Sequence, residues 1–157
     1  MADIHRLEAA APEIFQGLAD LSPEELRAVG AASARLAVAT SGLDDATVEV
    51  GLEALSQGRF GDDATLERLT ALVERLDEAQ WDLQDRVEVG AATEEEHVRA
   101  FSQARAANSL LCALERDPRE ATTEAVYEID PATGVATQVY LHPTTFDFGG
   151  VDVDLTN

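Results

Sequence analysis

Residues 63–87 read DATLERLTALVERLDEAQWDLQDRV, and this stretch decides the predicted fold. Its apolar residues recur every three or four positions, at Leu66, Leu69, Val73, Leu76, Leu83 and Val87. This spacing places side chains on one face of an α-helix. We therefore predict a long helix from about Asp63 to about Val87 whose apolar face packs against other helices.

Typical start and stop residues divide the remainder of the first 130 residues into further helices. Each start has a Ser, Thr or Asp cap, and several have a glutamate three residues after the cap, as in a capping box. The predicted starts are Ser22, Asp44 or Asp45, Thr93 and Asp117, and the predicted stops are Gly42 and Gly58. Residues 3–20 are predicted as one amphipathic helix that Pro12 kinks or divides. Short connections favour antiparallel neighbours, so we expect a mainly α fold, an antiparallel bundle of five or six helices.

The composition changes near the end of the chain. From Val135 onward it shifts toward Val, Thr, Tyr and Phe, which favour strands. The segment from Ala125 to Ile129 fits either a helix or a strand, and the upstream cap favours the helix. We predict a helical bundle domain over 1–130. Residues 131–157 are predicted as a C-terminal strand or tail segment, a short β-hairpin or an extended tail, packed on the bundle or extending from it.

The chain is strongly acidic and contains no lysine. Its 157 residues include 31 Asp and Glu against 11 basic residues, all arginine, for a formal net charge of −20. Nucleic acids and anionic membranes bind through clusters of positive charge, so neither is expected as a partner. A basic protein partner is expected instead. Bacteria or archaea with a salty cytoplasm have acidic surfaces on all their proteins, and a GC-rich genome favours arginine over lysine. The acidity can therefore reflect the habitat instead of a binding surface, and this alternative stays open.

The remaining composition predicts a cytoplasmic protein with one core. Asp3 lies where a signal peptide would carry positive charge, and no apolar run approaches the roughly 20 residues that cross a bilayer. The chain is long enough to bury a core without disulfides or metals. Its one cysteine, Cys112, is predicted to be a small buried hydrophobic residue.

Motifs for catalysis and metal binding are weak or incomplete. Glu94 and His97 have the Glu-x-x-His spacing of di-iron bundles, but a second such pair is missing from the sequence. Asp147–Gly149 reads DFG without the other kinase motifs. We therefore expect no cofactor, no metal and no enzymatic activity. The enzymatic alternative predicts a concave pocket that holds a buried acid with a shifted pKa.

Trp81 is the first candidate for a binding residue. On the helix predicted for 63–87 it lies roughly 130° from the centre of the apolar face. The acids on the same flank are Glu74, Asp77, Glu78 and Asp85. An exposed tryptophan surrounded by acids is typical of a binding hot spot for a basic partner. The alternative is that another helix covers this flank and that Trp81 belongs to the core.

The second candidate is the C-terminal tail, where apolar and acidic residues alternate on both sides of Gly149-Gly150. Two glycines permit a two-residue hairpin turn, which would place Asp147 opposite Asp152. Opposed carboxylates repel, so such a hairpin needs a cation, arginines from elsewhere or a partner. The predicted partner-binding residues of the tail are Phe146, Asp147, Phe148, Asp152 and Asp154. Alternatively, the apolar face docks on the helices and the aspartates face water.

Two functional hypotheses follow from these features. The first is a non-enzymatic acidic binding module, specifically an inhibitor of the immunity or antitoxin type that neutralises a basic partner such as a nuclease. The second is a structural or adaptor subunit that its C-terminal tail anchors in a larger assembly. Binding through an acidic face should weaken as salt rises, whereas apolar anchoring should survive salt. The sequence does not predict an oligomeric state.

Overall fold

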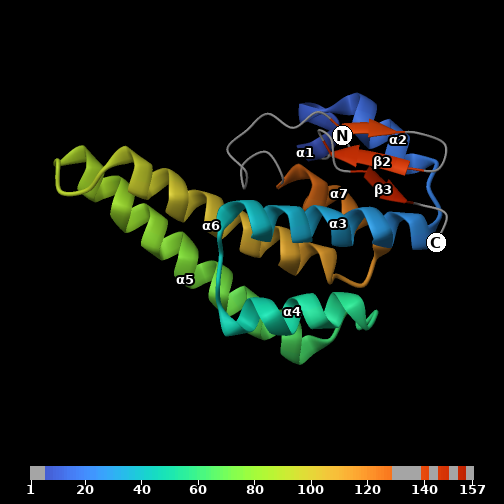
Figure 1. Ribbon diagram of the computed structural model, residues 1–157, viewed down its shortest axis with the longest axis horizontal. Helices are drawn as coiled ribbons and strands as arrows, with labels where there is room; N and C mark the ends of the chain where they lie inside the picture. The colour runs from blue at the N-terminus through green and yellow to red at the C-terminus, as the bar shows by residue number, and fades with distance from the viewer. Residues whose placement is uncertain (1–5, 129–138, 142–144, 149–151, 155–157) are drawn as a thin grey trace, which may run out of the picture.

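The computed structural model describes residues 6–128 and the backbone of three short strands, 139–141, 145–148 and 152–154 (Figure 1). Within these residues there are seven helices. The helices are α1 (Arg6–Ala10), α2 (Pro12–Ala19), α3 (Pro23–Ser41), α4 (Ala46–Ser56), α5 (Asp63–Glu88), α6 (Glu94–Ala113) and α7 (Pro118–Tyr127). The strands are β1 (Val139–Leu141), β2 (Thr145–Phe148) and β3 (Asp152–Asp154). The prediction of a mainly helical chain is confirmed.

Pro12 accounts for a helix beyond the predicted five or six. Proline has no backbone N–H, and its ring clashes with the preceding turn, so it suits the first position of a helix and not its interior. Accordingly α1 ends at Ala10, and α2 begins at Pro12. The segment predicted as one kinked or divided helix is divided.

The predicted caps set the helix starts. At α3, the Ser22 hydroxyl accepts a hydrogen bond from the Glu25 backbone N–H at 3.2 Å, and the Glu25 carboxylate accepts one from the Ser22 N–H at 2.9 Å. Thr93 and Glu96 form the same reciprocal pair at the start of α6. Gly42 ends α3 in the left-handed conformation, with φ of 70°.

Helix α7 resolves the ambiguity between helix and strand in favour of helix. It begins after the Asp117 cap, whose carboxylate accepts from the Glu120 backbone N–H at 2.9 Å. It continues through Ala125 to Tyr127, which confirms the favoured alternative for this part of the segment. Ile129 lies outside the described residues.

The core forms where α3 to α7 pack together. Its main apolar cluster contains Ala34 and Ala37 of α3, Leu69 and Leu72 of α5, and Leu110 of α6, all at most 1% exposed. Small residues let the helices approach closely. A Cβ atom added at Gly30 of α3 would lie 2.9 Å from Thr122 Oγ1 of α7. That hydroxyl donates a 2.6 Å hydrogen bond to the Leu26 carbonyl.

Helices α5 and α6 form an antiparallel pair that extends away from the other helices (Figure 1). Helix α5 has 26 residues and is therefore about 39 Å long at 1.5 Å per residue. The early part of its apolar face, including Leu69 and Leu72, is buried in the core, whereas Leu83 and Val87 are only half-buried. We call residues 77–105 the arm, and the remaining helical part the body.

The three strands form an antiparallel sheet in the order β1-β2-β3. It lies beside α2 and α3, away from the tip of the arm (Figure 1). In the β2–β3 pair, Phe146 is opposite Val153 and Asp147 is opposite Asp152. Residues 149–151 lie outside the description, so the predicted hairpin and the division at residue 130 stay predictions. In the part of the chain that the structure describes, no helix is both long enough and apolar enough to cross a membrane.

Candidate functional site

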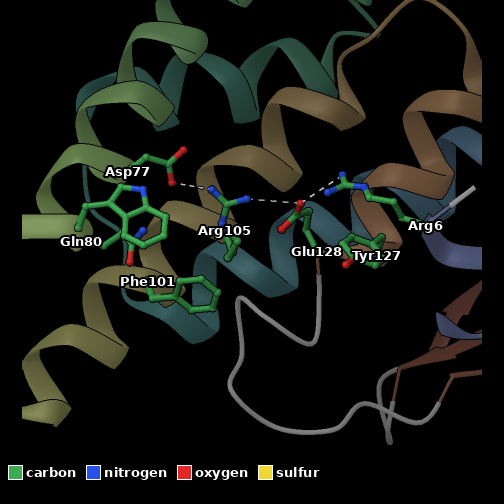
Figure 2. Close-up of a pocket in the computed structure, with 8 residues that line it drawn as sticks. Arg6, Asp77, Gln80, Phe101, Arg105, Tyr127 and Glu128 are labelled. Atoms are coloured by element: carbon green, nitrogen blue, oxygen red, sulfur yellow. Dashed lines mark hydrogen bonds and ion pairs between the residues drawn. The ribbon is translucent and has the colours of Figure 1, made fainter. Parts of the chain in front are cut away.

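A pocket of about 300 Å³ lies where the arm joins the body (Figure 2). Its lining combines aromatic rings, two arginines and two carboxylates. The lining residues are Arg6 of α1, Asp77, Gln80 and Trp81 of α5, Phe101 and Arg105 of α6, Tyr127 of α7 and Glu128 just after α7. A pocket of this size is at the lower end of the range for ligand sites.

Helical spacing explains how the arm presents these side chains. Asp77 and Trp81 are four residues apart on α5, and Phe101 and Arg105 are four residues apart on α6. Side chains at this separation lie on the same face of a helix. The two helices are antiparallel neighbours, so both pairs line the same pocket, and Figure 2 labels Asp77, Phe101 and Arg105 there.

The charged groups of the pocket form a chain of alternating sign. Asp77 Oδ1 is 2.6 Å from Arg105 Nη2, and Arg105 Nη1 is 3.6 Å from Glu128 Oε1. From the other side, Arg6 Nη2 is 3.6 Å from the same Glu128 oxygen and also pairs with Glu124. The dashed lines in Figure 2 show both arginines reaching one oxygen of Glu128. Glu128 thus links the arm to α1.

Glu128 is the most buried ionisable group of the pocket, with only 1% of its side chain exposed. Its Oε1 accepts a hydrogen bond from Asn108 Nδ2 at 3.0 Å, and the two arginines form ion pairs with the same oxygen. Its Oε2 is buried and has no hydrogen-bond partner among the described residues, and the same holds for Arg105 Nε. Burial raises the pKa of Glu128, although Arg105 and Asn108 oppose the shift. An unsatisfied buried carboxylate oxygen is costly unless another group binds it.

The aromatic rings of the pocket differ in what covers them. The Arg6 guanidinium carbon lies 4.5 Å from the centre of the Tyr127 ring, and that of Arg105 lies 6.0 Å from the centre of the Phe101 ring. Trp81 has no such cation among the described residues, and 59% of it is exposed. The alternative that Trp81 belongs to the core is therefore wrong. The second half of α5 projects into the arm, where fewer neighbouring helices cover its flanks (Figure 1).

The Glu-x-x-His pair of α6, Glu94 and His97, makes contacts with neighbouring side chains of the arm. His97 Nε2 is 3.1 Å from the side-chain oxygen of Gln80, which is 4% exposed, and His97 Nδ1 is 3.7 Å from Glu94 Oε1. The contact between His97 and Gln80 connects the two helices of the arm, and the contact with Glu94 lies within α6. Within residues 6–128 and the three strands, no group of three or more His, Cys, Asp and Glu residues is arranged to hold a metal ion.

The predicted residues of α5 do not all meet at one place. Asp77 and Trp81 line the pocket, and Glu78 and Asp85 are exposed on α5 without lining it. Glu74 lines a different cavity of about 320 Å³, beside Leu66 and Thr70. Of the four acids predicted to surround Trp81, Asp77 is therefore the one that lines the same pocket.

The predicted residues of the tail are described only by their backbone. Phe146, Asp147 and Phe148 belong to β2, and Asp152 and Asp154 belong to β3. Thr145 is opposite Asp154 in the same antiparallel pair. Their side chains lie outside the description, so their role in binding stays a prediction.

The sequence reasoning missed most of the pocket. The missed residues are Arg6, Gln80, Phe101, Arg105, Tyr127 and Glu128. Phe101 and Arg105 carried a local signal, because they have the same four-residue spacing as Asp77 and Trp81 on the neighbouring helix. Arg6 and Glu128 have no sequence pattern that predicts their contact, since they meet only when α1 packs beside α7.

Comparison of the chain with protein-family models, with curated proteins and with solved structures found no match. The functional argument therefore rests on the chemistry of the arm and of its pocket.

Proposed function

We propose that this protein is a non-catalytic binding module whose arm engages a basic protein partner. The observation that carries the proposal is the distribution of exposed apolar residues. Among the described residues, the exposed large hydrophobic side chains are Trp81, Val89, Val98 and Phe101, and all of them lie on the arm. Exposed apolar groups gathered on one part of a surface typically mark an interaction site.

The charge of the arm favours a basic partner. Residues 77–105 contain eight acidic residues and three arginines. This excess of acid per residue is about one and a half times that in the rest of the chain, which is itself acidic, so charge by itself does not single out the arm. An exposed tryptophan on the same helix as several exposed acids does single out the arm, because aromatic anchors provide binding energy while charges accelerate and orient the encounter.

Within this class, we favour an inhibitor of the immunity or antitoxin type. An acidic projecting arm can occupy the groove through which a basic enzyme, such as a nuclease toxin, holds phosphates. The support is an analogy at the level of the class together with the net charge of −20. An inhibitor of this kind acts inside the cell that makes the toxin, which agrees with the cytoplasmic location predicted from the sequence.

The second candidate is a structural or adaptor subunit anchored through its C-terminal tail. Its support is the alternation of apolar and acidic residues over 146–155, together with the proposed hairpin around Gly149 and Gly150. A terminal strand can extend the sheet of a partner through backbone hydrogen bonds. In this case the arm would be incidental to binding.

A third candidate, an enzyme, gains one observation from the pocket. Glu128 is a buried acid with a raised pKa in a concave site, which is the arrangement that the enzymatic alternative predicts. Binding is favoured because Glu128 Oε1 is engaged by Asn108 and lies near two arginines, and Asp77 is paired with Arg105. A general acid needs an open path to a reacting group, and these contacts fit a structural carboxylate better.

Capture experiments with matched charge variants test the proposal. One variant removes three exposed arm acids, Asp82→Asn, Asp85→Asn and Glu88→Gln, and the control removes three exposed body acids, Glu8→Gln, Glu49→Gln and Glu67→Gln. Proteins captured by the full chain are identified, and their affinity is then measured with purified components. We expect a basic partner whose affinity falls at least about ten-fold for the arm variant and on raising the salt concentration.

The same capture distinguishes the candidates. Equal losses for the arm variant and the body control would contradict the role of the arm. A partner that survives high salt but is lost from a chain ending at His142 would favour the adaptor. A captured partner that the protein covalently changes would favour the enzyme.

A further inference from the structure

We propose that one side of the arm binds a basic amphipathic helix of the protein partner, which lies lengthwise against α5 and α6. The inference rests on the proposed function and specifies which kind of partner segment the arm binds. Its support is the spacing of the exposed apolar residues, the helical backbone of the arm and the distribution of charge between the two sides of the arm.

Two rows of side chains define this side of the arm. Each row has intervals of four, three and four residues, and positions at these intervals follow one side of an α-helix. The α5 row is Asp77, Trp81, Gln84 and Glu88, and the α6 row is Glu94, Val98, Phe101 and Arg105. Each row extends for about 17 Å, or three turns, at 1.5 Å per residue.

The two rows lie on the same side of the arm. Asp77 and Trp81 line one pocket together with Phe101 and Arg105, so the rows meet at the end next to the body. Figure 2 labels Asp77, Phe101 and Arg105 there, and Asp77 Oδ1 is 2.6 Å from Arg105 Nη2. Because α5 and α6 are antiparallel neighbours, the rows continue side by side toward the tip (Figure 1).

The rows contain most of the exposed apolar side chains of the described residues. Of the four exposed large hydrophobic side chains, Trp81, Val98 and Phe101 belong to the rows, and Val89 lies at the tip. Exposed apolar residues at helical spacing on two neighbouring helices can be covered by a third helix whose own apolar residues follow the same spacing. An amphipathic helix of about three turns matches the length of the rows.

The backbone of the arm favours a helix over a strand as the bound segment. A strand that binds by extending a sheet needs free backbone N–H and C=O groups along an edge. The rows belong to α5 and α6, where these groups form hydrogen bonds between successive turns. An incoming helix satisfies its own backbone groups in the same way and needs only side-chain contacts with the arm.

The charges of the arm favour a basic helix. Glu88 and Glu94 are exposed at the tip end of the rows, and Arg105, the arginine in the rows, is already paired with an acid. The other two arginines of the arm, Arg86 and Arg99, lie about 170° and about 130° around their helices from the middle of each row. Basic residues beside the apolar face of an incoming helix would therefore meet acids, whereas a second copy of this acidic chain would bring like charges together.

The experiment uses the full chain and a synthetic peptide of about 14 residues, which is long enough to cover both rows. The peptide has leucines at three-four spacing on one face of its helix and lysines at all other positions. Trp81 is the only tryptophan of the chain, so its emission reports on the rows. We expect a saturable shift of this emission to shorter wavelength. We also expect a helical circular dichroism signal larger than the sum of the two components, because the peptide folds on binding.

Two control peptides test the parts of the inference. The first has the same composition but alternates leucine and lysine, so its leucines share one face only in a strand. The second keeps the leucines and has glutamate in place of lysine. Each should bind at least about ten-fold more weakly than the probe. Equal binding of either control, or no saturable change with the probe itself, would overturn the inference.

Matched apolar variants locate the peptide on the arm. Val98→Ala combined with Phe101→Ala removes exposed apolar groups from the α6 row and should weaken binding about ten-fold. Val89→Ala removes an exposed apolar group outside the rows and should change binding less than about two-fold. Circular dichroism shows whether each variant is folded. Chemical shift changes in the unmodified chain give a second location, and changes confined to residues outside the rows would overturn the inference.

Matched charge variants test the acids of the rows. Glu88→Gln combined with Glu94→Gln should weaken binding of the lysine peptide about five-fold. The control combines Glu78→Gln with Glu95→Gln, two exposed arm acids outside the rows, and should change binding less than about two-fold. Equal effects of the two pairs would show that the peptide responds only to net charge, and the inference would be wrong.

Other occupants of the rows give different results. If the full chain forms dimers that the Val98→Ala, Phe101→Ala variant dissociates, the rows bind a second copy and the inference is wrong. It is also wrong if NMR cross-peaks connect the Trp81 indole of the full chain to residues 129–157, because the chain would then cover the rows itself.

The outcomes separate this inference from the proposed function. If the peptide fails to bind but the arm acids still govern capture of a basic partner, the proposed function stands and the inference about the helix is wrong. If the peptide binds at the rows but neutralising the arm acids has no effect on capture, the rows bind a basic helix and the proposed function is wrong.

Discussion

Asp77 of α5 and Arg105 of α6 form an ion pair in which Asp77 Oδ1 lies 2.6 Å from Arg105 Nη2. The pair is located where the arm leaves the body, and the other terminal nitrogen of Arg105 extends toward Glu128. Asp77 therefore holds Arg105 in the orientation that connects the two parts of the pocket.

Replacing Asp77 should destabilise the fold to a modest extent. Asp77→Asn removes the charge from a hydrogen bond that is only partly shielded from solvent, so we expect a loss of about 1 kcal/mol in the free energy of unfolding. Urea denaturation followed by circular dichroism measures this loss. The matched control, Glu78→Gln on the exposed side of α5, should stay within about 0.5 kcal/mol of the unmodified chain. Equal effects of the two changes would mean that the ion pair contributes nothing.

Arg27 should be more sensitive to substitution than Arg35, the other arginine of α3. Its guanidinium donates to the carbonyls of Ala113, Glu115 and Arg116 at 3.3, 2.6 and 2.5 Å, and it lies over the Phe60 ring at 3.8 Å. Lysine cannot reproduce this fork of donors or the stacking. We expect Arg27→Lys to lower the free energy of unfolding by about 2 kcal/mol, measured by urea denaturation.

Arg35→Lys provides the control for Arg27, because Arg35 is an exposed arginine of the same helix with a single described hydrogen bond, to Ser56. Its change in unfolding free energy should stay below about 0.5 kcal/mol. If both lysine variants behaved alike, the carbonyl contacts of Arg27 would have no energetic importance.

Glu128 should make the folded chain less stable as the pH rises, which is the opposite of the effect of an acid whose pKa is lowered by folding. Because burial raises the pKa of Glu128 in the folded chain, the folded state keeps this proton to a higher pH than the unfolded state does. Glu128 therefore becomes less favourable for folding as pH rises from its unfolded pKa through its folded pKa. Glu128→Gln should be more stable than the unmodified chain at pH 8, and this advantage should shrink as the pH approaches 5.

Thermal or urea midpoints of both chains at several values between pH 5 and pH 8 measure this dependence. The difference between the Glu78→Gln variant and the unmodified chain should stay nearly constant over the same range. A Glu128→Gln variant that loses stability most at pH 8 would show that the ionised carboxylate is net stabilising, contrary to the expected direction.

Trp81 offers a direct measure of the potential on the arm. The indole is 59% exposed and lies among acidic residues, so caesium ions should quench its fluorescence more efficiently than iodide ions at low ionic strength. The difference should decrease as salt is added, since the screening length falls to about 10 Å at 0.1 M. Equal quenching by both ions at low salt would indicate that Arg6 and Arg105 cancel the acids near the ring.

The helix starts could be predicted because their determinants are local. Ser22 with Glu25 and Thr93 with Glu96 satisfy backbone groups within three residues, so the pattern can be recognised without knowledge of the fold. The length of α5 followed from its apolar stripe in the same way. What the stripe did not show is that α5 leaves the body halfway along, which depends on the lengths of the other helices.

The pocket was beyond prediction because its residues come from distant parts of the chain. Arg6 and Glu128 meet through the packing of α1 beside α7, and neither side chain has a sequence pattern that indicates its neighbour. An acidic residue after a helix normally faces solvent, and Glu128 is buried only because of this tertiary contact. Trp81 was correctly placed on the flank of its helix, but only the structure shows that nothing covers it fully.

The projecting geometry of α5 and α6 also bears on how this protein can diversify. The residues near the tip, such as Val89 at 79% exposed, are far from the core that stabilises the body. Equal insertions or deletions of whole turns in both helices would change the reach of the arm by about 5 Å per turn while leaving the core intact. The length of the arm can therefore change while the body serves as a constant scaffold.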